Sequence, residues 1–235
     1  MILMLMILLI PIQDEKEIQL TAADGMIIYG IENKQDSEVT ILLFHQAGSN
    51  AKAEYGGHII QKLLEEGYST IAIDQRKGGS RLGGTNRTAE QVEGSISYCD
   101  AYPDLVATLE YATNKGQKIV VWGSSYSAAL VYKLAAEHGE DISGVLSFSP
   151  ASGAPMGNCS PDKFLKDLKS PSLAFRPGKE ASMETVKSQI EYFKSMDVKT
   201  YVSPLGVHGS SMLNPEKSGG VEETWIAVLD FLRSI

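Results

Sequence analysis

Short apolar runs alternate with longer segments of helical periodicity along most of the chain. The continuous apolar runs at residues 38–45, 69–75 and 118–125 are typical of strands that a sheet buries on both faces. Three further strand-like runs follow at 143–150, 170–178 and 198–205. Apolar residues at helical spacing predict helices between and after these runs, at 51–66, 101–116, 128–140, 183–196 and 219–235.

Strands and helices that alternate in this way predict a mostly parallel sheet with helices on both of its faces, so the predicted fold class is α/β. The start of the chain differs from the rest. Two short strand patterns at 17–22 and 25–32 are joined through Asp24 and Gly25, a pair that favours a hairpin. We therefore expect antiparallel strands at one edge of the sheet. The polar, glycine-rich stretch at 76–97 is predicted to be a long loop.

Composition narrows the class of protein without identifying it. The 235 residues, of which 43% are hydrophobic and 21% charged, are typical of a single globular domain, which we place at 17–235. The formal net charge is -8 and no basic run occurs, which argues against a nucleic-acid partner.

Residues 1–16 form a separate segment that begins with the apolar run MILMLMILLIPI. This run is too short to span a bilayer, so no integral membrane span is predicted, but it has the length of the apolar core of a signal peptide. No Lys or Arg precedes it, and no small-residue cleavage site follows it. A misassigned start codon or a short hydrophobic arm is the alternative. The run favours a periplasmic or secreted protein over a cytoplasmic one.

Cys99 and Cys159 are the two cysteines of the chain. They lack CxxC spacing and no histidine cluster accompanies them, so no metal site is predicted. The sequence leaves two possibilities: the cysteines are free thiols, or, in an exported protein, they form a disulfide with each other. No P-loop and no dinucleotide-binding glycine motif occurs, and no cofactor is expected.

The candidate chemistry lies at the carboxyl ends of the predicted strands, where parallel sheets bind their ligands. Ser125 has Gly123 two positions before it and Ser127 two positions after it, which fits the sharp turn of a G-x-S-x-G nucleophile. Ser124 has the bulky Trp122 at the first of these positions, and Ser127 has no flanking glycine. Ser125 is therefore the predicted nucleophile. A serine that only caps the following helix is the competing interpretation.

The stretches VVWGSSYSAAL, LLFHQAGSNAKAEY, IAIDQRKGGS and LGVHGSSML together resemble the α/β-hydrolase superfamily. More narrowly, they resemble its small dienelactone-hydrolase-like and lipase/esterase-like members. The resemblance covers the chain from residue 17 to its end, although Ser127 stands where glycine is commoner. It implies an eight-stranded, mostly parallel sheet and a triad of serine, acid and histidine.

His208 is the predicted base, because it follows the last predicted strand and is flanked by glycines that permit a tight, exposed loop. The other histidines fit structural roles. His58 and His138 lie in predicted helices, and His45 closes a strand at a position where similar hydrolases carry a structural histidine.

Glu180 is the predicted acid of the triad, since it follows the strand at 170–178 and stands between the serine and the histidine in chain order. A carboxylate that only stabilises a helix N-terminus is the competing interpretation. Glu184, Asp162 and Asp167 are alternative acids. Asp74 precedes the nucleophile and is expected to fix its own turn.

Backbone N–H groups are expected to stabilise the charge that develops on the substrate oxygen. Tyr126, directly after the nucleophile, should supply one of them. By resemblance, Ala47 should supply the other, with Gln46 as the second choice. Gln46 occupies the position at which glycine is usual, so the sequence leaves this choice open.

These residues predict a serine hydrolase that cleaves a carboxylic ester or a lactone through an acyl-enzyme intermediate. Residues 151–170 leave room for only a loop and one short helix, so we expect a minimal lid and a small-molecule substrate. A serine peptidase of the same fold would use the same residues. A non-catalytic binding module is the alternative from a different class.

Overall fold

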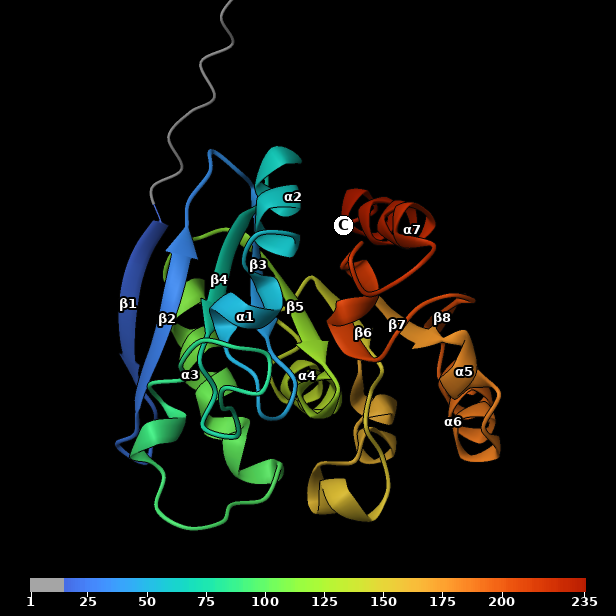
Figure 1. Ribbon diagram of the computed structural model, residues 1–235, viewed down its shortest axis with the longest axis horizontal. Helices are drawn as coiled ribbons and strands as arrows, with labels where there is room; N and C mark the ends of the chain where they lie inside the picture. The colour runs from blue at the N-terminus through green and yellow to red at the C-terminus, as the bar shows by residue number, and fades with distance from the viewer. Residues whose placement is uncertain (1–14) are drawn as a thin grey trace, which may run out of the picture.

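The computed structural model describes residues 15–235, so the predictions for the apolar start of the chain lie outside the described residues. Eight strands form one sheet in the order β1-β2-β4-β3-β5-β6-β7-β8 (Figure 1). The strands are β1 (Glu15–Thr21), β2 (Ile27–Asn33), β3 (Val39–Phe44), β4 (Ser69–Ile73), β5 (Lys118–Ser124), β6 (Gly144–Phe148), β7 (Ser172–Pro177) and β8 (Lys199–Ser203). Strands β3 to β8 pair in parallel. The predicted α/β class and the mostly parallel sheet are confirmed.

The antiparallel edge of the sheet is the predicted hairpin. Strands β1 and β2 pair antiparallel, with Thr21 opposite Ile27, and β2 is also antiparallel to β4. Gly25 has a φ of 85° in the connecting turn, a conformation that glycine adopts without steric cost. The local turn signal was therefore sufficient to predict this edge.

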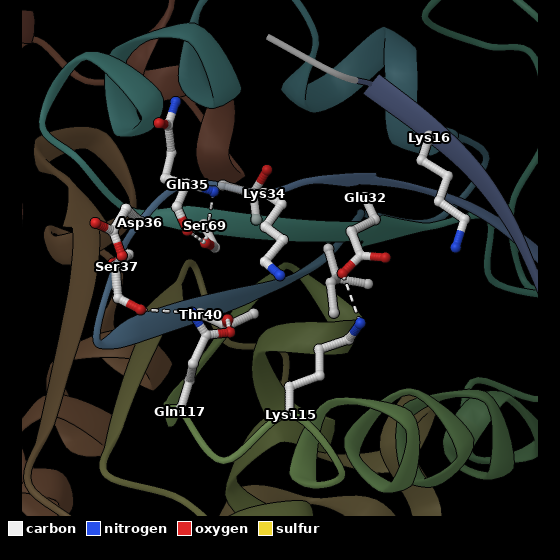
Figure 2. A pocket seen from close by; sticks show the side chains of 12 residues that line it. Lys16, Glu32, Lys34, Gln35, Asp36, Ser37, Thr40, Ser69, Lys115 and Gln117 are labelled. Atoms are coloured by element: carbon white, nitrogen blue, oxygen red, sulfur yellow. Dashed lines mark hydrogen bonds and ion pairs between the residues drawn. The ribbon is translucent and has the colours of Figure 1, made fainter.

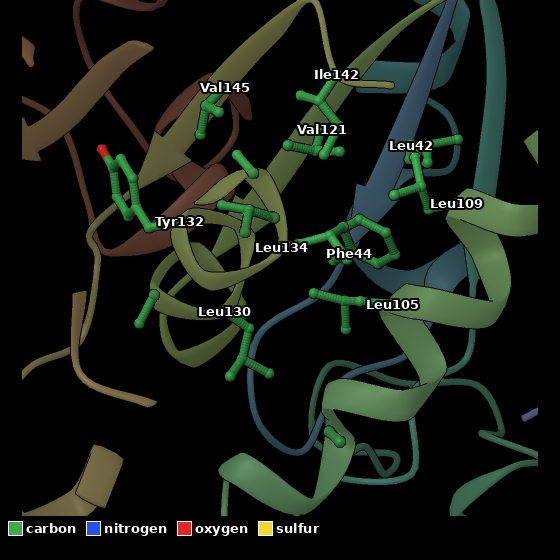
Figure 3. Packing of buried hydrophobic residues seen from close by; sticks show 14 of the residues in the cluster. Leu42, Phe44, Leu105, Leu109, Val121, Leu130, Tyr132, Leu134, Ile142 and Val145 are labelled. Atoms are coloured by element: carbon green, nitrogen blue, oxygen red, sulfur yellow. The ribbon is translucent and has the colours of Figure 1, made fainter. Parts of the chain in front are cut away.

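Helices cover both faces of the sheet. Helices α1 (Ala51–Tyr55), α2 (Ile59–Glu65) and α7 (Val221–Arg233) pack on one face, and α3 (Tyr102–Thr113), α4 (Tyr126–Glu137) and α6 (Glu184–Ser195) pack on the other. Figure 3 shows the second layer, in which Phe44 and Val121 of the sheet belong to one buried cluster with Leu105 of α3 and Leu130 of α4. None of the helices within residues 15–235 combines the length and apolar composition that crossing a membrane requires.

The helix predicted at 51–66 is in fact two helices, α1 and α2. The break falls at Gly56 and Gly57. Gly57 has a φ of 79°, which interrupts the helical hydrogen-bond ladder, and Gly56 is already extended. Two adjacent glycines outweigh the apolar periodicity that suggested one helix.

The predicted lid segment, residues 151–170, contains short 3₁₀ helices and no α-helix. They are η3 (Ala154–Cys159), η4 (Pro161–Lys163) and η5 (Leu165–Asp167). A disulfide joins Cys159 to Cys99, at the start of the short helix η2 (Cys99–Ala101), with Cα atoms 5.6 Å apart. Of the two possibilities that the sequence left open, the structure has the disulfide. The bond attaches the lid segment to the chain that leads into α3.

Cys99→Ser is expected to lower the free energy of unfolding by about 2–4 kcal/mol, because the bond closes a long loop in the unfolded chain. The two cysteines are 60 residues apart in sequence. Urea unfolding with and without reductant measures the effect, and Cys159→Ser is the matched control that should behave alike. Two thiols titrating in the folded, non-reduced protein would contradict the pairing.

Candidate active site

Ser125 occupies a strained turn between β5 and α4. Its φ of 61° and ψ of −113° are unfavourable for a residue with a side chain. The Ser125 N–H donates to the Phe148 carbonyl at 2.8 Å, and its carbonyl accepts from the Ala151 N–H at 3.0 Å. These bonds to the chain at and beyond the end of β6 hold the turn in this conformation. The hydroxyl is thereby presented beyond the carboxyl end of the sheet.

Small residues on either side make the turn possible. A Cβ atom on Gly123 would lie 2.4 Å from the Ser127 carbonyl oxygen, so only glycine fits there. Ser127 itself uses its hydroxyl to fasten the turn: Oγ lies 2.5 Å from the Phe44 carbonyl oxygen and accepts from the Ser124 N–H at 2.9 Å. Ser127 stands where glycine is usual, and its hydroxyl forms hydrogen bonds that a glycine could not form.

The structure brings His208 next to Ser125. The His208 Nε2 atom lies 2.9 Å from the Ser125 Oγ atom, and the imidazole is about half exposed. Two hydroxyls anchor the loop that carries it, since the Gly209 N–H donates to Ser149 and the Ser210 N–H donates to Ser124. A base held at this distance from a serine hydroxyl can accept its proton.

Glu180 contacts the other nitrogen of the same ring. Its Oε1 lies 2.5 Å from His208 Nδ1, and its Oε2 accepts from Arg176 Nη1 at 2.9 Å. Glu180 belongs to the short helix α5 (Gly178–Ala181), which directly follows β7 and was not predicted. Burial raises the pKa of the Glu180 carboxyl, but His208 and then Arg176 outweigh it, so the pKa is lowered. The carboxylate is therefore ionised at neutral pH.

Arg176 is a site residue that the sequence did not reveal. Its guanidinium is buried and also donates to the Pro150 carbonyl and to the Gln189 side chain. It fixes the second oxygen of Glu180 and leaves the first oxygen facing His208. No local pattern marks it, because Arg176 belongs to strand β7 and Glu180 to helix α5, so no helical spacing relates the two.

The alternative acids do not reach His208. Glu184 is exposed and pairs with Lys187 at 3.4 Å. Asp162 bonds to Ser160 in the lid segment, and Asp167 lies at the end of the 3₁₀ helix η5. Among the described residues, Glu180 is the carboxylate that contacts the histidine.

Two further polar residues have the structural roles expected of them. His45 Nδ1 lies 2.8 Å from the Gln46 carbonyl, and its Nε2 accepts from the Gln75 N–H at 2.8 Å. Burial lowers the pKa of His45 to about 4, so the ring is neutral. Asp74 accepts hydrogen bonds from the backbone N–H groups of Ala51 and Arg87 and holds its own turn.

The loop after β3 narrows the choice of the second N–H donor. The Gln46 N–H is not available, because it donates to the Glu54 Oε2 atom at 2.9 Å. The Ala47 N–H forms no hydrogen bond within residues 15–235. Tyr126 opens α4, so its N–H has no acceptor inside the helix. Ala47 and Tyr126 therefore remain the candidate donors.

Glu54, on α1, is a second residue that the sequence did not single out. Its carboxyl is buried, and this burial raises its pKa even though Oε2 accepts from the Gln46 N–H. It is joined to the Gln46 N–H eight residues earlier, and so fixes the loop that presents Ala47. Nothing in the sequence marks it, because an acidic residue on a short helix is usually exposed.

Glu54→Ala is expected to lower kcat by about 10- to 100-fold with little change in KM, because loss of an oriented donor weakens transition-state stabilisation. Glu54→Gln retains an acceptor for the Gln46 N–H and should stay close to wild type. Steady-state kinetics on one ester distinguishes the two variants. Equal losses in both would show that the carboxyl acts in another way.

Another cavity lies away from Ser125. A cavity of 830 Å³ is lined by polar side chains that include Lys34, Thr40, Ser69 and Gln117 (Figure 2). Thr40, Ser69 and Gln117 stand at the starts of the parallel strands β3, β4 and β5. This cavity therefore lies at the end of the sheet opposite Ser125. Within residues 15–235, no group of three or more His, Cys, Asp and Glu side chains is placed to hold a metal ion.

The fold is that of the α/β-hydrolase superfamily. The chain belongs to its Hydrolase_4 family, described as serine aminopeptidase, S33, whose model matches residues 35–198. The matched stretch includes Ser125 and Glu180 and ends before His208. No curated protein matches the chain.

Solved structures share the fold at low identity. An esterase from Pyrococcus furiosus has a TM-score of 0.73 at 19% identity, over 94% of this chain and 91% of the other. A protein assigned as a dienelactone hydrolase from Klebsiella pneumoniae has a TM-score of 0.69 at 15% identity, over 94% and 100%. Est1E from Butyrivibrio proteoclasticus, with ferulic acid bound, has a TM-score of 0.69 at 14% identity, over 92% and 98%. The predicted resemblance to small hydrolases of this superfamily is confirmed.

Proposed function

We propose that the protein is a serine hydrolase that cleaves a carboxylic ester or a lactone. The observation that carries the proposal is the continuous line of contacts from Ser125 Oγ to His208 Nε2 at 2.9 Å and from His208 Nδ1 to Glu180 Oε1 at 2.5 Å. A serine hydroxyl is a weak nucleophile until a base takes its proton, and a carboxylate behind the base fixes the tautomer that can do so.

In the proposed mechanism, the Ser125 oxygen attacks the ester carbonyl while its proton passes to His208 Nε2. Glu180 stabilises the imidazolium that forms. The negative charge on the former carbonyl oxygen is stabilised by the N–H groups of Tyr126 and Ala47. His208 then protonates the leaving alcohol, and a water molecule activated by the same histidine hydrolyses the acyl-enzyme.

Cleavage of peptides or aminoacyl amides is the second candidate, because the matching family is described as a serine aminopeptidase. The two candidates share a triad and differ in leaving group. A para-nitrophenyl acetate and a set of aminoacyl para-nitroanilides, assayed with the same protein, separate them. Ester turnover with no anilide turnover supports the esterase, and the reverse result supports the peptidase.

Short acyl esters are expected to be cleaved faster than long ones. The lid segment at 151–170 holds only short 3₁₀ helices and is tied to η2 by the disulfide, so it offers no wide apolar surface for a long chain. We expect kcat/KM for para-nitrophenyl esters to be highest for acetate or butyrate and to fall toward longer chains. A clear preference for long chains would instead make the lid segment a lipid-binding element.

A further inference from the structure

A second, smaller cavity adjoins the loop of the proposed N–H donors. It has a volume of 450 Å³, and its lining includes Ala47, Gly48, Lys77, Gly78 and Tyr98. Ala47 is one of the two candidate donors. The cavity therefore borders the loop that carries this candidate donor.

Backbone and ring contacts fix the walls of this cavity relative to the site. The Gly48 N–H donates to the Lys77 carbonyl at 3.3 Å, and the Arg81 N–H donates to the Gly48 carbonyl at 2.9 Å. On the other side, the Tyr98 ring stacks on Tyr126 with centroids 5.1 Å apart. Tyr126 directly follows Ser125 in sequence. Both walls are thus attached to the residues that surround the nucleophile.

The charged side chains that line the cavity are basic, although the protein as a whole is acidic. The chain carries a formal net charge of -8, but no Asp or Glu lines this cavity, whereas Lys77 and Arg76 do. Arg76 is neutralised by Asp24 and Asp104. Lys77 donates to the Ile96 carbonyl, and no carboxylate within residues 15–235 lies within 4.0 Å of its ammonium.

Arg81 adds a second positive charge beside the same loop. Its guanidinium donates to the Gln46 side-chain oxygen at 2.9 Å and is exposed. The other arginines of the described chain all pair with a carboxylate, namely Arg76, Arg87, Arg176 and Arg233. Glu90 and Glu93 belong to the loop that forms the outer wall, but neither lines the cavity. Lys77 and Arg81 therefore lie next to the site without an anionic partner in this part of the chain.

We propose that this cavity binds a carboxylate carried by the substrate, so that the preferred substrate is an anionic ester. The Lys77 ammonium is its counter-ion, and Arg81 draws the anion toward the cavity from the rim. The ester carbonyl then lies at the N–H groups of Ala47 and Tyr126, within reach of Ser125. This inference rests on the proposed function, because it concerns the specificity of that same hydrolysis.

Matched ester pairs test the proposal. The para-nitrophenyl monoester of glutaric acid carries a carboxylate on the acyl side, and para-nitrophenyl pentanoate is its neutral counterpart of equal chain length. A second pair, the butyrate esters of para-hydroxybenzoic acid and of its methyl ester, places the charge on the alcohol side. We expect the intact, disulfide-bonded protein to favour the anionic member of at least one pair in kcat/KM. Raising the ionic strength from about 0.05 to 0.5 M should reduce that preference.

Lys77→Met is expected to reduce the preference, measured as the ratio of kcat/KM for the anionic ester to that for its neutral counterpart, about 3- to 10-fold, since methionine keeps the length of the side chain and removes its charge. Lys77→Arg should retain the preference. Lys187→Met changes the net charge equally on an exposed helix and is the matched control. Unchanged preference in Lys77→Met, or no preference in the wild type, would overturn the cavity assignment while ester turnover upheld the proposed function. A folded protein that cleaves none of the esters would overturn both.

Discussion

Ser125→Ala is expected to abolish ester turnover, with a loss of about four to six decades in kcat, because no other hydroxyl within residues 15–235 contacts His208. Within the described residues, the Ser125 hydroxyl forms a hydrogen bond to His208 alone, so its removal should leave the turn and the sheet intact. A fluorophosphonate probe, which reacts with an activated serine, should label the wild type and leave the variant unlabelled.

The neighbouring serines provide the internal comparison for this experiment. Ser124 is buried and accepts from the Ser210 N–H, and Ser127 is buried within the turn. Within residues 15–235 neither hydroxyl contacts a histidine, so the labelled peptide should carry the probe on Ser125. Label on Ser124 or Ser127, or a folded wild type that takes no label, would refute the assignment of the nucleophile.

Glu180→Gln is expected to lower kcat by up to about four decades with little change in KM. The amide can still accept or donate a hydrogen bond at His208 Nδ1, but it cannot stabilise an imidazolium, and it allows the tautomer that cannot accept the Ser125 proton. Because the pKa of Glu180 is lowered, the wild-type carboxylate stays ionised through neutral and mildly acidic pH. The variant should differ in rate across that whole range.

Glu184→Gln is the matched control, four residues further along the chain at the start of α6. Its carboxylate is exposed and contacts only Lys187, so the substitution should leave turnover unchanged. If the carboxylate at position 180 only stabilised the start of a helix, Glu180→Gln would have a different effect from the one expected above. Its replacement would lower stability by about 0.3–1 kcal/mol and leave kcat unchanged. Urea unfolding of both variants, measured beside the kinetics, separates these outcomes.

The sequence could predict those parts of the fold that local patterns encode. Buried runs such as 118–125 are apolar because both faces of the strand are covered, and this holds wherever the strand pairs. The helix predicted at 51–66 was an exception. Two glycines divide this segment into two helices, and the spacing of its apolar residues does not reveal the break. The short helix α5 was too brief to produce a periodic pattern.

By itself, the sequence determined the turn at Ser125, since Gly123 and the small residues after it are required within a few positions of the nucleophile. Only the tertiary structure decided which groups support that turn. The buried partner of Gln46 is Glu54, the ring of His208 comes from 83 residues beyond Ser125, and Cys99 meets Cys159 across 60 residues. Such contacts depend on how the crossover connections return the chain to the same edge of the sheet. The spacing of residues along the chain does not tell how far apart they lie in space. These partners can therefore be identified only in the folded protein.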